Sequence, residues 1–219
     1  NDFYDQPIAE ATRKEVLRLC GLEGNVGEPK KRLLDFGAGG GRYMECFASV
    51  LAKENVAGVE VDDDQIARAR AKGFCVAKLD ASRASLPYAD QAFEIVFSSN
   101  VIEHIPRELY LVYLQEIDRV LVPGGRFVVG TPNYPFKRFY DIKKGLKTGR
   151  FRYYFFDDPT HCNRLTCSQL EKDLKPYFKS IHLQPTYLLM ERKLPFLKRP
   201  SVRHRLRYLG DKLVGVCIK

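Results

Sequence analysis

The 219-residue chain lacks several features that would decide its class at once. It has no apolar run as long as a membrane span, and its start shows no secretory signal peptide. It also has no internal repeat and no low-complexity segment. The remaining composition, 45% hydrophobic and 29% charged, is that of an ordinary globular protein. We therefore expect a single domain over residues 1–219, located in the cytoplasm.

Cysteines are few and poorly placed for crosslinks or metal binding. The six cysteines are scattered, mostly inside apolar segments, which favours reduced, buried thiols. Only Cys162 and Cys167, with His161 beside the first, approach the spacing of zinc ligands. Because no second ligand pair stands nearby, we predict no metal site.

Acidic residues become scarce towards the C-terminus. Residues 1–130 hold 16 basic and 20 acidic residues, whereas residues 131–219 hold 20 basic and only 7 acidic ones. An anionic partner would therefore meet the C-terminal part of the chain. A nucleic acid, a lipid head group and a small phosphorylated substrate all fit this asymmetry.

Apolar runs and helical patterns alternate along most of the chain. We expect strands at residues 32–36, 56–61, 74–80, 93–99, 126–132, 180–189 and 212–219. Helices are expected at residues 7–20, 41–53, 63–73, 107–121 and 165–178. The first five strands are continuous rather than alternating apolar runs, so the sheet should be parallel and covered on both faces. Right-handed crossovers make such an α/β sheet doubly wound.

The stretch LLDFGAGGGR, residues 33–42, places a glycine loop between the first strand and a helix. Glycines there let the backbone approach a ligand closely. A dinucleotide-binding loop needs G-x-G-x-x-G, but the third glycine position of that pattern falls on Arg42. Asp35 would also lie close to an incoming pyrophosphate. These features favour a ligand with a cationic part, such as S-adenosylmethionine.

Polar residues also follow the next three strands, where an open parallel sheet binds ligands. Glu60 can accept hydrogen bonds from both ribose hydroxyls, and Asp80 can accept one from an adenine amino group flanked by the Ala81 backbone. Ser98, Ser99 and Asn100 follow the fourth strand, beside the methionine part. The predicted cofactor-binding residues are Asp35, Gly37, Ala38, Gly39, Glu60, Val61, Asp80, Ala81, Ser99 and Asn100.

These motifs, together with LPYADQAFEIVFSSNVIEHI and EIDRVLVPGGRFVVGTPN, resemble the class I S-adenosylmethionine-dependent methyltransferases. The resemblance covers roughly residues 30–133 and is strongest to the small-molecule branch typified by ubiquinone-biosynthesis and sugar methyltransferases. Glu94 departs mildly from the family, which often has Asp there. The family implies a Rossmann-like, doubly wound α/β sheet of seven strands, mostly parallel, with an antiparallel last strand between the fifth and sixth.

Two histidines are candidates for a catalytic base, which an oxygen nucleophile of high pKa would need. His104 follows the fourth strand in VIEHIP, next to the expected methyl group, and His161 lies in DDPTHCNRLT. Each could instead be a structural histidine. Glu103 could orient the cofactor or its neighbour.

Two segments after the fifth strand have unusual composition. Residues 133–160 are rich in aromatic and basic residues, and we interpret them as a long loop that forms a lid carrying the acceptor pocket. Residues 192–210 form a basic insertion with seven Lys or Arg and no acid. This insertion is either a solvated basic helix or a contact with an anionic membrane or an acidic acceptor.

The leading hypothesis is a methyltransferase that uses S-adenosylmethionine on a small-molecule acceptor, with oxygen favoured over nitrogen or carbon. The acceptor would be a sugar, a quinone-like ring or a lipid-linked glycan. An RNA methyltransferase is the first alternative, although the chain lacks the Asn/Asp-Pro-Pro-aromatic run of many base methyltransferases and a separate RNA-binding module. A non-catalytic cofactor-binding scaffold is the second. A dehydrogenase is least favoured, because of the glycine spacing.

Overall fold

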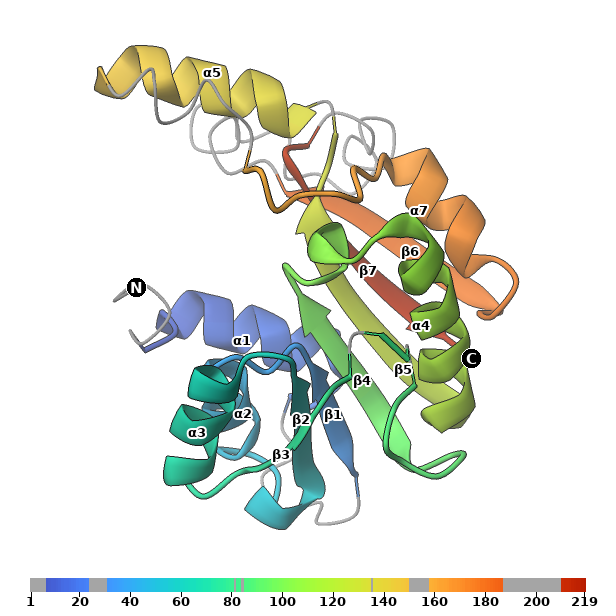
Figure 1. The fold of residues 1–219 in the computed structure, drawn as a ribbon. Coiled ribbons are helices and arrows are strands. Elements are labelled where there is room, and N and C mark those ends of the chain that lie inside the picture. Colours follow the sequence, from blue (N-terminus) through green and yellow to red (C-terminus); the bar gives the residue numbers. More distant parts are fainter. Residues whose placement is uncertain are drawn as a thin grey trace.

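The apolar strands assemble into one sheet with helices on both faces (Figure 1). The computed structural model describes residues 7–23, 31–80, 82–83, 85–134, 136–149, 158–186 and 210–219. The strands within these residues are β1 (Leu33–Phe36), β2 (Val56–Glu60), β3 (Cys75–Lys78), β4 (Phe93–Ser99), β5 (Leu121–Pro132), β6 (Ser180–Thr186) and β7 (Lys212–Ile218). The helices are α1 (Glu10–Leu19), α2 (Arg42–Phe47), α3 (Asp63–Ala71), α4 (Arg107–Val120), α5 (Phe136–Thr148) and α7 (Cys167–Leu174), with short 3-10 turns η1 (Lys53–Asn55) and η2 (Ile102–His104).

The described strands lie in the order β3-β2-β1-β4-β5-β7-β6. Strands β1 to β5 pair in parallel, and β7 runs antiparallel to both β5 and β6. This confirms the predicted doubly wound sheet and its antiparallel last strand. The strand order reverses between β1 and β4, so their carboxyl ends border the crevice where such sheets bind ligands.

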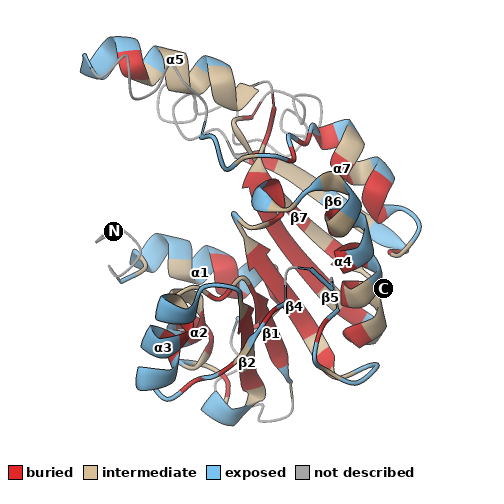
Figure 2. Ribbon diagram, in the orientation of Figure 1, coloured by how far each residue is buried: buried red, intermediate tan, exposed pale blue. Residues whose placement is uncertain are grey.

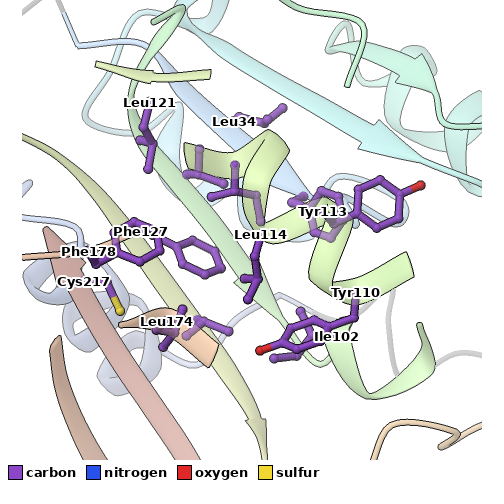
Figure 3. Packing of buried hydrophobic residues seen from close by; sticks show 14 of the residues in the cluster. Leu34, Ile102, Tyr110, Tyr113, Leu114, Leu121, Phe127, Leu174, Phe178 and Cys217 are labelled. Carbon is purple, nitrogen blue, oxygen red and sulfur yellow. The ribbon is translucent and has the colours of Figure 1, made fainter. Parts of the chain in front are cut away.

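Each face of the sheet packs a separate hydrophobic core, so its strands are buried (Figure 2). Figure 3 shows Tyr110 and Leu114 of α4 with Leu174 of α7 in the core of one face. The opposite core includes Leu17 of α1 and Met44 of α2. Burial on both faces explains why the parallel strands are continuous apolar runs.

Local sequence explains where the principal helices begin and which side they bury. In α4, the buried side chains recur at helical spacing: Tyr110, Tyr113, Leu114, Ile117 and Val120. Asp62 caps α3 by accepting a hydrogen bond from the Gln65 N–H at 3.0 Å. Thr166 caps α7 in the same way, with Gln169 as donor at 3.1 Å.

Residues 133–160 differ from the expected long loop. Residues 136–148 form helix α5, which projects beyond the carboxyl end of β5 (Figure 1). Apolar residues at positions 136, 139, 142 and 146 follow a helical period, which the aromatic composition of the segment obscured. A helix is expected over residues 41–53, but α2 covers only Arg42–Phe47. Strand β5 begins five residues before its predicted start.

Several sequence-based expectations fall on residues outside the described ranges. These are Ala81, the aromatic residues at 151–156 and all of the basic insertion except Gly210. None of the six cysteines, all of which lie in the described ranges, forms a disulfide; Cys75 and Cys162 are exposed and the other four are buried. Among the described residues, no helix combines the length and apolarity needed to cross a bilayer.

Candidate active site

The glycine loop folds over the carboxyl end of β2. The N–H groups of Gly37 and Ala38 both donate to the Val59 carbonyl at 3.0 Å. Gly37 has a φ of 82°, and a Cβ added there would lie 2.3 Å from Val101 Cγ2. A side chain is therefore excluded at Gly37 on two grounds. Around Gly39, by contrast, an added Cβ would meet only Gln65 Oε1, at 4.0 Å, so its surface is open to a ligand.

Glu60 lies directly under this loop. Its Oε2 accepts a hydrogen bond from the Gly39 N–H at 2.8 Å, and its Oε1 accepts one from the Val61 N–H at 2.7 Å. These backbone donors fix the carboxylate at the end of β2, where the sequence places a ribose contact. Val61 is 50% exposed, an unusual position for an apolar side chain at the end of a buried strand. An exposed valine beside a fixed carboxylate suits a purine ring joined to a ribose.

Asp35 is a buried acid at the end of β1, only 1% exposed. Its Oδ2 has no hydrogen-bond partner among the described residues. Burial raises the pKa of Asp35 well above its usual range, and the nearby Glu60 carboxylate raises it further. A cationic group of a ligand would compensate both effects, so the site is suited to an ammonium or sulfonium.

The ends of β3 and β4 carry the other predicted polar groups. Asp80 Oδ1 accepts hydrogen bonds from the Ser82 N–H at 2.9 Å and the Ser82 hydroxyl at 2.6 Å, which lower the pKa of Asp80. Asn100 takes a left-handed conformation, with φ 56°, and donates its N–H to the Gly130 carbonyl at 2.7 Å. Ser98 is buried, and its hydroxyl is without a partner among the described residues, whereas Ser99 is half-buried and Asn100 is exposed.

The two candidate histidines, 57 positions apart in the chain, lie together. Their ring centroids are 4.7 Å apart in an edge-to-face arrangement. His161 Nδ1 shares a hydrogen bond of 2.6 Å with the Tyr134 hydroxyl, and His104 Nδ1 shares one of 2.9 Å with the Thr160 hydroxyl. Asp158 Oδ2 lies 3.9 Å from His161 Nε2. Hydrogen bonds from the Thr160 hydroxyl and N–H lower the pKa of Asp158, and the two histidines lower it further.

A buried carboxylate and a half-buried lysine interact close to the histidine pair. Glu103 is 1% exposed, and its Oε2 accepts a hydrogen bond from the Thr131 hydroxyl at 3.1 Å. Burial raises the pKa of Glu103, and burial lowers the pKa of Lys212, while His104 and Lys212 act on Glu103 in the opposite direction. The two groups thus partly neutralise one another.

Glu103, His104 and His161 also form the one group of potential metal ligands found among the described residues, with ligand atoms within 4.8 Å of one another. The Lys212 ammonium already places a positive charge beside Glu103. That charge disfavours a metal cation in the same place, and the absence of a metal remains a prediction.

Sequence reasoning missed the residues that hold the histidines. Tyr134 contacts His161 from just after the end of β5, and Asp158 and Thr160 contact the pair from a segment that follows no strand. Tyr134 lies in the aromatic segment, but no local feature distinguishes it from its aromatic neighbours. Lys212 had a clearer signal, because it is a lysine at the start of an otherwise apolar strand.

Residues 34–129 match the family model described as "Methyltransferase domain". Within these residues the chain has a methyltransferase domain of the class I S-adenosylmethionine-dependent kind. The matched residues run from β1 to β5 and contain the glycine loop, Glu60, Asp80 and His104. S-adenosylmethionine is the cofactor that this family implies. The loop, the exposed Val61 and the uncompensated Asp35 all fit a cationic nucleoside of this kind.

Curated relatives match the methyltransferase domain over part of their length. Sarcosine/dimethylglycine N-methyltransferase of Halorhodospira halochloris is 33% identical over 134 residues, covering 58% of this chain and 47% of that protein. The 27-O-demethylrifamycin SV methyltransferase of Amycolatopsis mediterranei is 31% identical over 136 residues, covering 59% and 48%. The chain thus spans about half the length of these relatives.

Solved structures match nearly the whole chain at low identity. A SAM-dependent methyltransferase from Archaeoglobus fulgidus has a TM-score of 0.65 and 19% identity, covering 96% of this chain and 94% of that one. One from Mesorhizobium loti has a TM-score of 0.64 and 18% identity, covering 94% and 97%. At this identity the matches show the fold alone, and they show it for nearly the whole chain.

Proposed function

We propose that this chain transfers a methyl group from S-adenosylmethionine to an oxygen atom of a small-molecule acceptor. The observation that carries the proposal is the meeting of four strand ends around the glycine loop, with Asp35 buried and uncompensated beneath it. We assign the cofactor contacts to the ten residues predicted from the sequence. The whole of residues 1–219 would act as one methyltransferase domain.

Each assigned group has a defined task. The Glu60 carboxylate accepts a ribose hydroxyl at the acceptor site that Oε2 keeps beside its bond from Gly39, because Oε1 already accepts from the Val61 and Asp62 N–H groups. Asp35 faces the cationic part of the cofactor, and Val61 covers the purine. When bound, S-adenosylmethionine supplies a methyl group already activated by its sulfonium, so alignment and exclusion of water account for much of the acceleration.

His161 is the better placed base of the histidine pair. If its Nδ1–H donates to the Tyr134 oxygen, Nε2 keeps a lone pair that can take a proton from an acceptor hydroxyl. Asp158, 3.9 Å from Nε2, would then stabilise the imidazolium. We assign His104 to the other side of the acceptor. The buried Glu103 holds the turn that carries His104 by accepting from Thr131.

The curated relatives support a small-molecule acceptor without specifying its atom. One is named for an N-methylation of sarcosine and dimethylglycine and another for a demethylrifamycin acceptor. We favour oxygen because a histidine base serves a hydroxyl best. The acceptor class remains a sugar, a quinone-like ring or a lipid-linked glycan.

The test is transfer of labelled methyl from S-adenosylmethionine to a panel of sugars, phenols, lipid-linked glycans and transfer RNA. Product on a hydroxyl of a small molecule is the expected result. Labelling of RNA alone, with binding that weakens as salt rises, would favour the RNA methyltransferase instead. Cofactor binding without turnover on any acceptor would favour a non-catalytic scaffold.

A further inference from the structure

Helix α5 has an exposed face of unusual chemistry. Phe139 is 66% exposed and Leu146 is 69% exposed, the highest values among the large apolar side chains that the structure describes as exposed. Lys143 and Lys147 are also exposed. At 3.6 residues per turn, these four positions fall within about 100° of the helix circumference. One face of α5 therefore presents two apolar side chains next to two ammonium groups. Figure 2 shows the exposed positions along this helix.

The charge of α5 is almost entirely positive on this exposed side. The helix contains five basic residues and a single acid, Asp141. Asp141 is mostly buried, and its Oδ2 accepts from Lys137 Nζ at 2.7 Å and lies 3.8 Å from Arg138 Nη1. The carboxylate of Asp141 thus interacts with basic side chains of the first turn of the helix. Beyond it, Lys143 and Lys147 have no neighbouring acid on α5 itself.

We propose that α5 binds the surface of an anionic lipid bilayer. Phe139 and Leu146 would enter the boundary between head groups and acyl chains, while the lysine stems extend to the anionic head groups. A nucleic acid would match the lysines and could stack on Phe139, but it offers no apolar phase for Leu146. The paired apolar positions therefore favour lipid over RNA.

The position of α5 links this surface to the candidate active site. The helix begins four residues after β5 and projects from the carboxyl edge of the sheet (Figure 1). Lys137 donates its N–H to the Asn133 carbonyl at 2.8 Å, and its ammonium lies 5.8 Å from the ring centroid of Tyr134. Tyr134 in turn holds His161. A bilayer bound at α5 would thus lie on the acceptor side of the histidine pair.

A consequence follows for the acceptor, and it rests on the proposed function. Among the acceptor classes above, a lipid-linked molecule would be presented to the site by the same bilayer that holds α5. Its polar head would carry the hydroxyl to be methylated.

Flotation with lipid vesicles tests the proposal on the wild-type chain without cofactor. Vesicles containing phosphatidylglycerol should bind the protein at low salt, and pure phosphatidylcholine vesicles should bind it far less. Lys143→Gln with Lys147→Gln should weaken partitioning about thirtyfold. Phe139→Ser with Leu146→Ser should weaken it about tenfold or more, because the apolar burial is lost.

Matched variants control for general effects of charge and polarity. Lys172→Gln with Lys175→Gln removes the same two charges at the end of α7, and Leu111→Ser with Val112→Ser makes the same polar change on exposed positions of α4. Both controls should bind vesicles as the wild type does. Unchanged binding in the α5 variants, absent vesicle binding, or binding only to RNA would overturn the proposal.

Failure of the membrane proposal can be separated from failure of the proposed function. Flotation requires neither cofactor nor turnover, so its result stands alone. A protein that binds S-adenosylmethionine but no vesicles contradicts only the role of α5. A protein that floats but does not bind the cofactor contradicts only the proposed function.

Discussion

The N-terminal region, residues 1–130, and the C-terminal region, residues 131–219, contribute to the candidate site in different ways. The first is net acidic and places polar groups at the ends of regular strands. The second is strongly basic and supplies His161, Tyr134 and Thr160 from segments at or beyond the strand ends. The family match ends at residue 129, close to this boundary.

We infer from this difference that the N-terminal region binds the cofactor, a function shared across the family, and that the C-terminal region binds the acceptor, which differs between family members. A strand end is fixed by the sheet, so a cofactor site built there tolerates little change. Loops and added helices vary more easily and determine which acceptor is bound. We therefore expect variants of the two regions to separate cofactor binding from turnover.

The largest effect is expected at His161, which represents the C-terminal region. His161→Ala removes the proposed base and should lower turnover about 10²- to 10⁴-fold, while the affinity for S-adenosylmethionine stays unchanged. Steady-state kinetics with labelled cofactor and calorimetry measure the two quantities. His182→Ala, on the exposed side of β6, is the control and should behave as wild type. Wild-type turnover in His161→Ala would remove this residue from the mechanism.

The contact between the two regions can be tested through an ion pair. Arg107 of α4 donates to Asp173 of α7 at 2.6 Å, and the Asp173 side chain is only 5% exposed. Arg107→Ala leaves that carboxylate without its charged partner. Because the Arg107 side chain is 35% exposed, we expect a loss of about 2 kcal/mol in the free energy of unfolding, measured in urea.

The matched variant is Arg18→Ala on α1, whose ion pair with Glu15 is about half exposed on both sides. This substitution should lower the free energy of unfolding by less than about 0.5 kcal/mol. Equal losses in the two variants would mean that the Arg107–Asp173 pair does not hold the regions together.

Glu60 tests the N-terminal region. Glu60→Gln removes a charged acceptor for a ribose hydroxyl, so the affinity for S-adenosylmethionine should fall about tenfold or more. Turnover at saturating cofactor should change little. Glu94→Gln makes the same replacement at the opposite end of the sheet, beside Arg32, and should leave the affinity as it is. A drop in saturated turnover with intact affinity would contradict the assignment of Glu60.

The buried Asp35 carboxyl should lower the free energy of unfolding of the protein without cofactor. Because its folded-state pKa is raised, the folded protein holds the proton more tightly than the unfolded chain does, and stability falls as pH rises from the unfolded pKa through the folded one. Without cofactor, Asp35→Asn should therefore be more stable than the wild type at neutral pH. This difference in stability between Asp35→Asn and the wild type should disappear at pH values below the pKa that Asp35 has in the unfolded chain.

Thermal unfolding across this pH range measures the effect, with a rise in Tm of about 3 °C for each kcal/mol gained. A variant that is less stable at neutral pH would show that Asp35 is compensated in the free protein.

Metal removal should have the smallest effect. Treatment with a chelator should leave turnover unchanged, because Lys212 supplies the positive charge beside Glu103. Lost turnover that zinc, manganese or magnesium restores would show instead that Glu103, His104 and His161 bind a metal.

Much of the fold, and the clustering of polar residues at the candidate site, could be predicted because both follow from where strands end. Parallel strands finish at one edge, so Asp35, Glu60, Asp80 and Asn100 had to lie near one another. The pairing of His104 with His161 and the ion pair of Arg107 with Asp173 depend on how distant segments pack. No local pattern encodes such contacts, and α5 was hidden by its aromatic composition.

A calorimetric titration with S-adenosylmethionine and its demethylated product, with NAD as a control, tests the proposed cofactor site most directly. We predict micromolar binding of S-adenosylmethionine and of its product, lost in Asp35→Ala and weakened in Glu60→Ala, and no binding of NAD. A folded protein that binds neither of the two, or that binds NAD more tightly, would contradict a site for S-adenosylmethionine at the glycine loop.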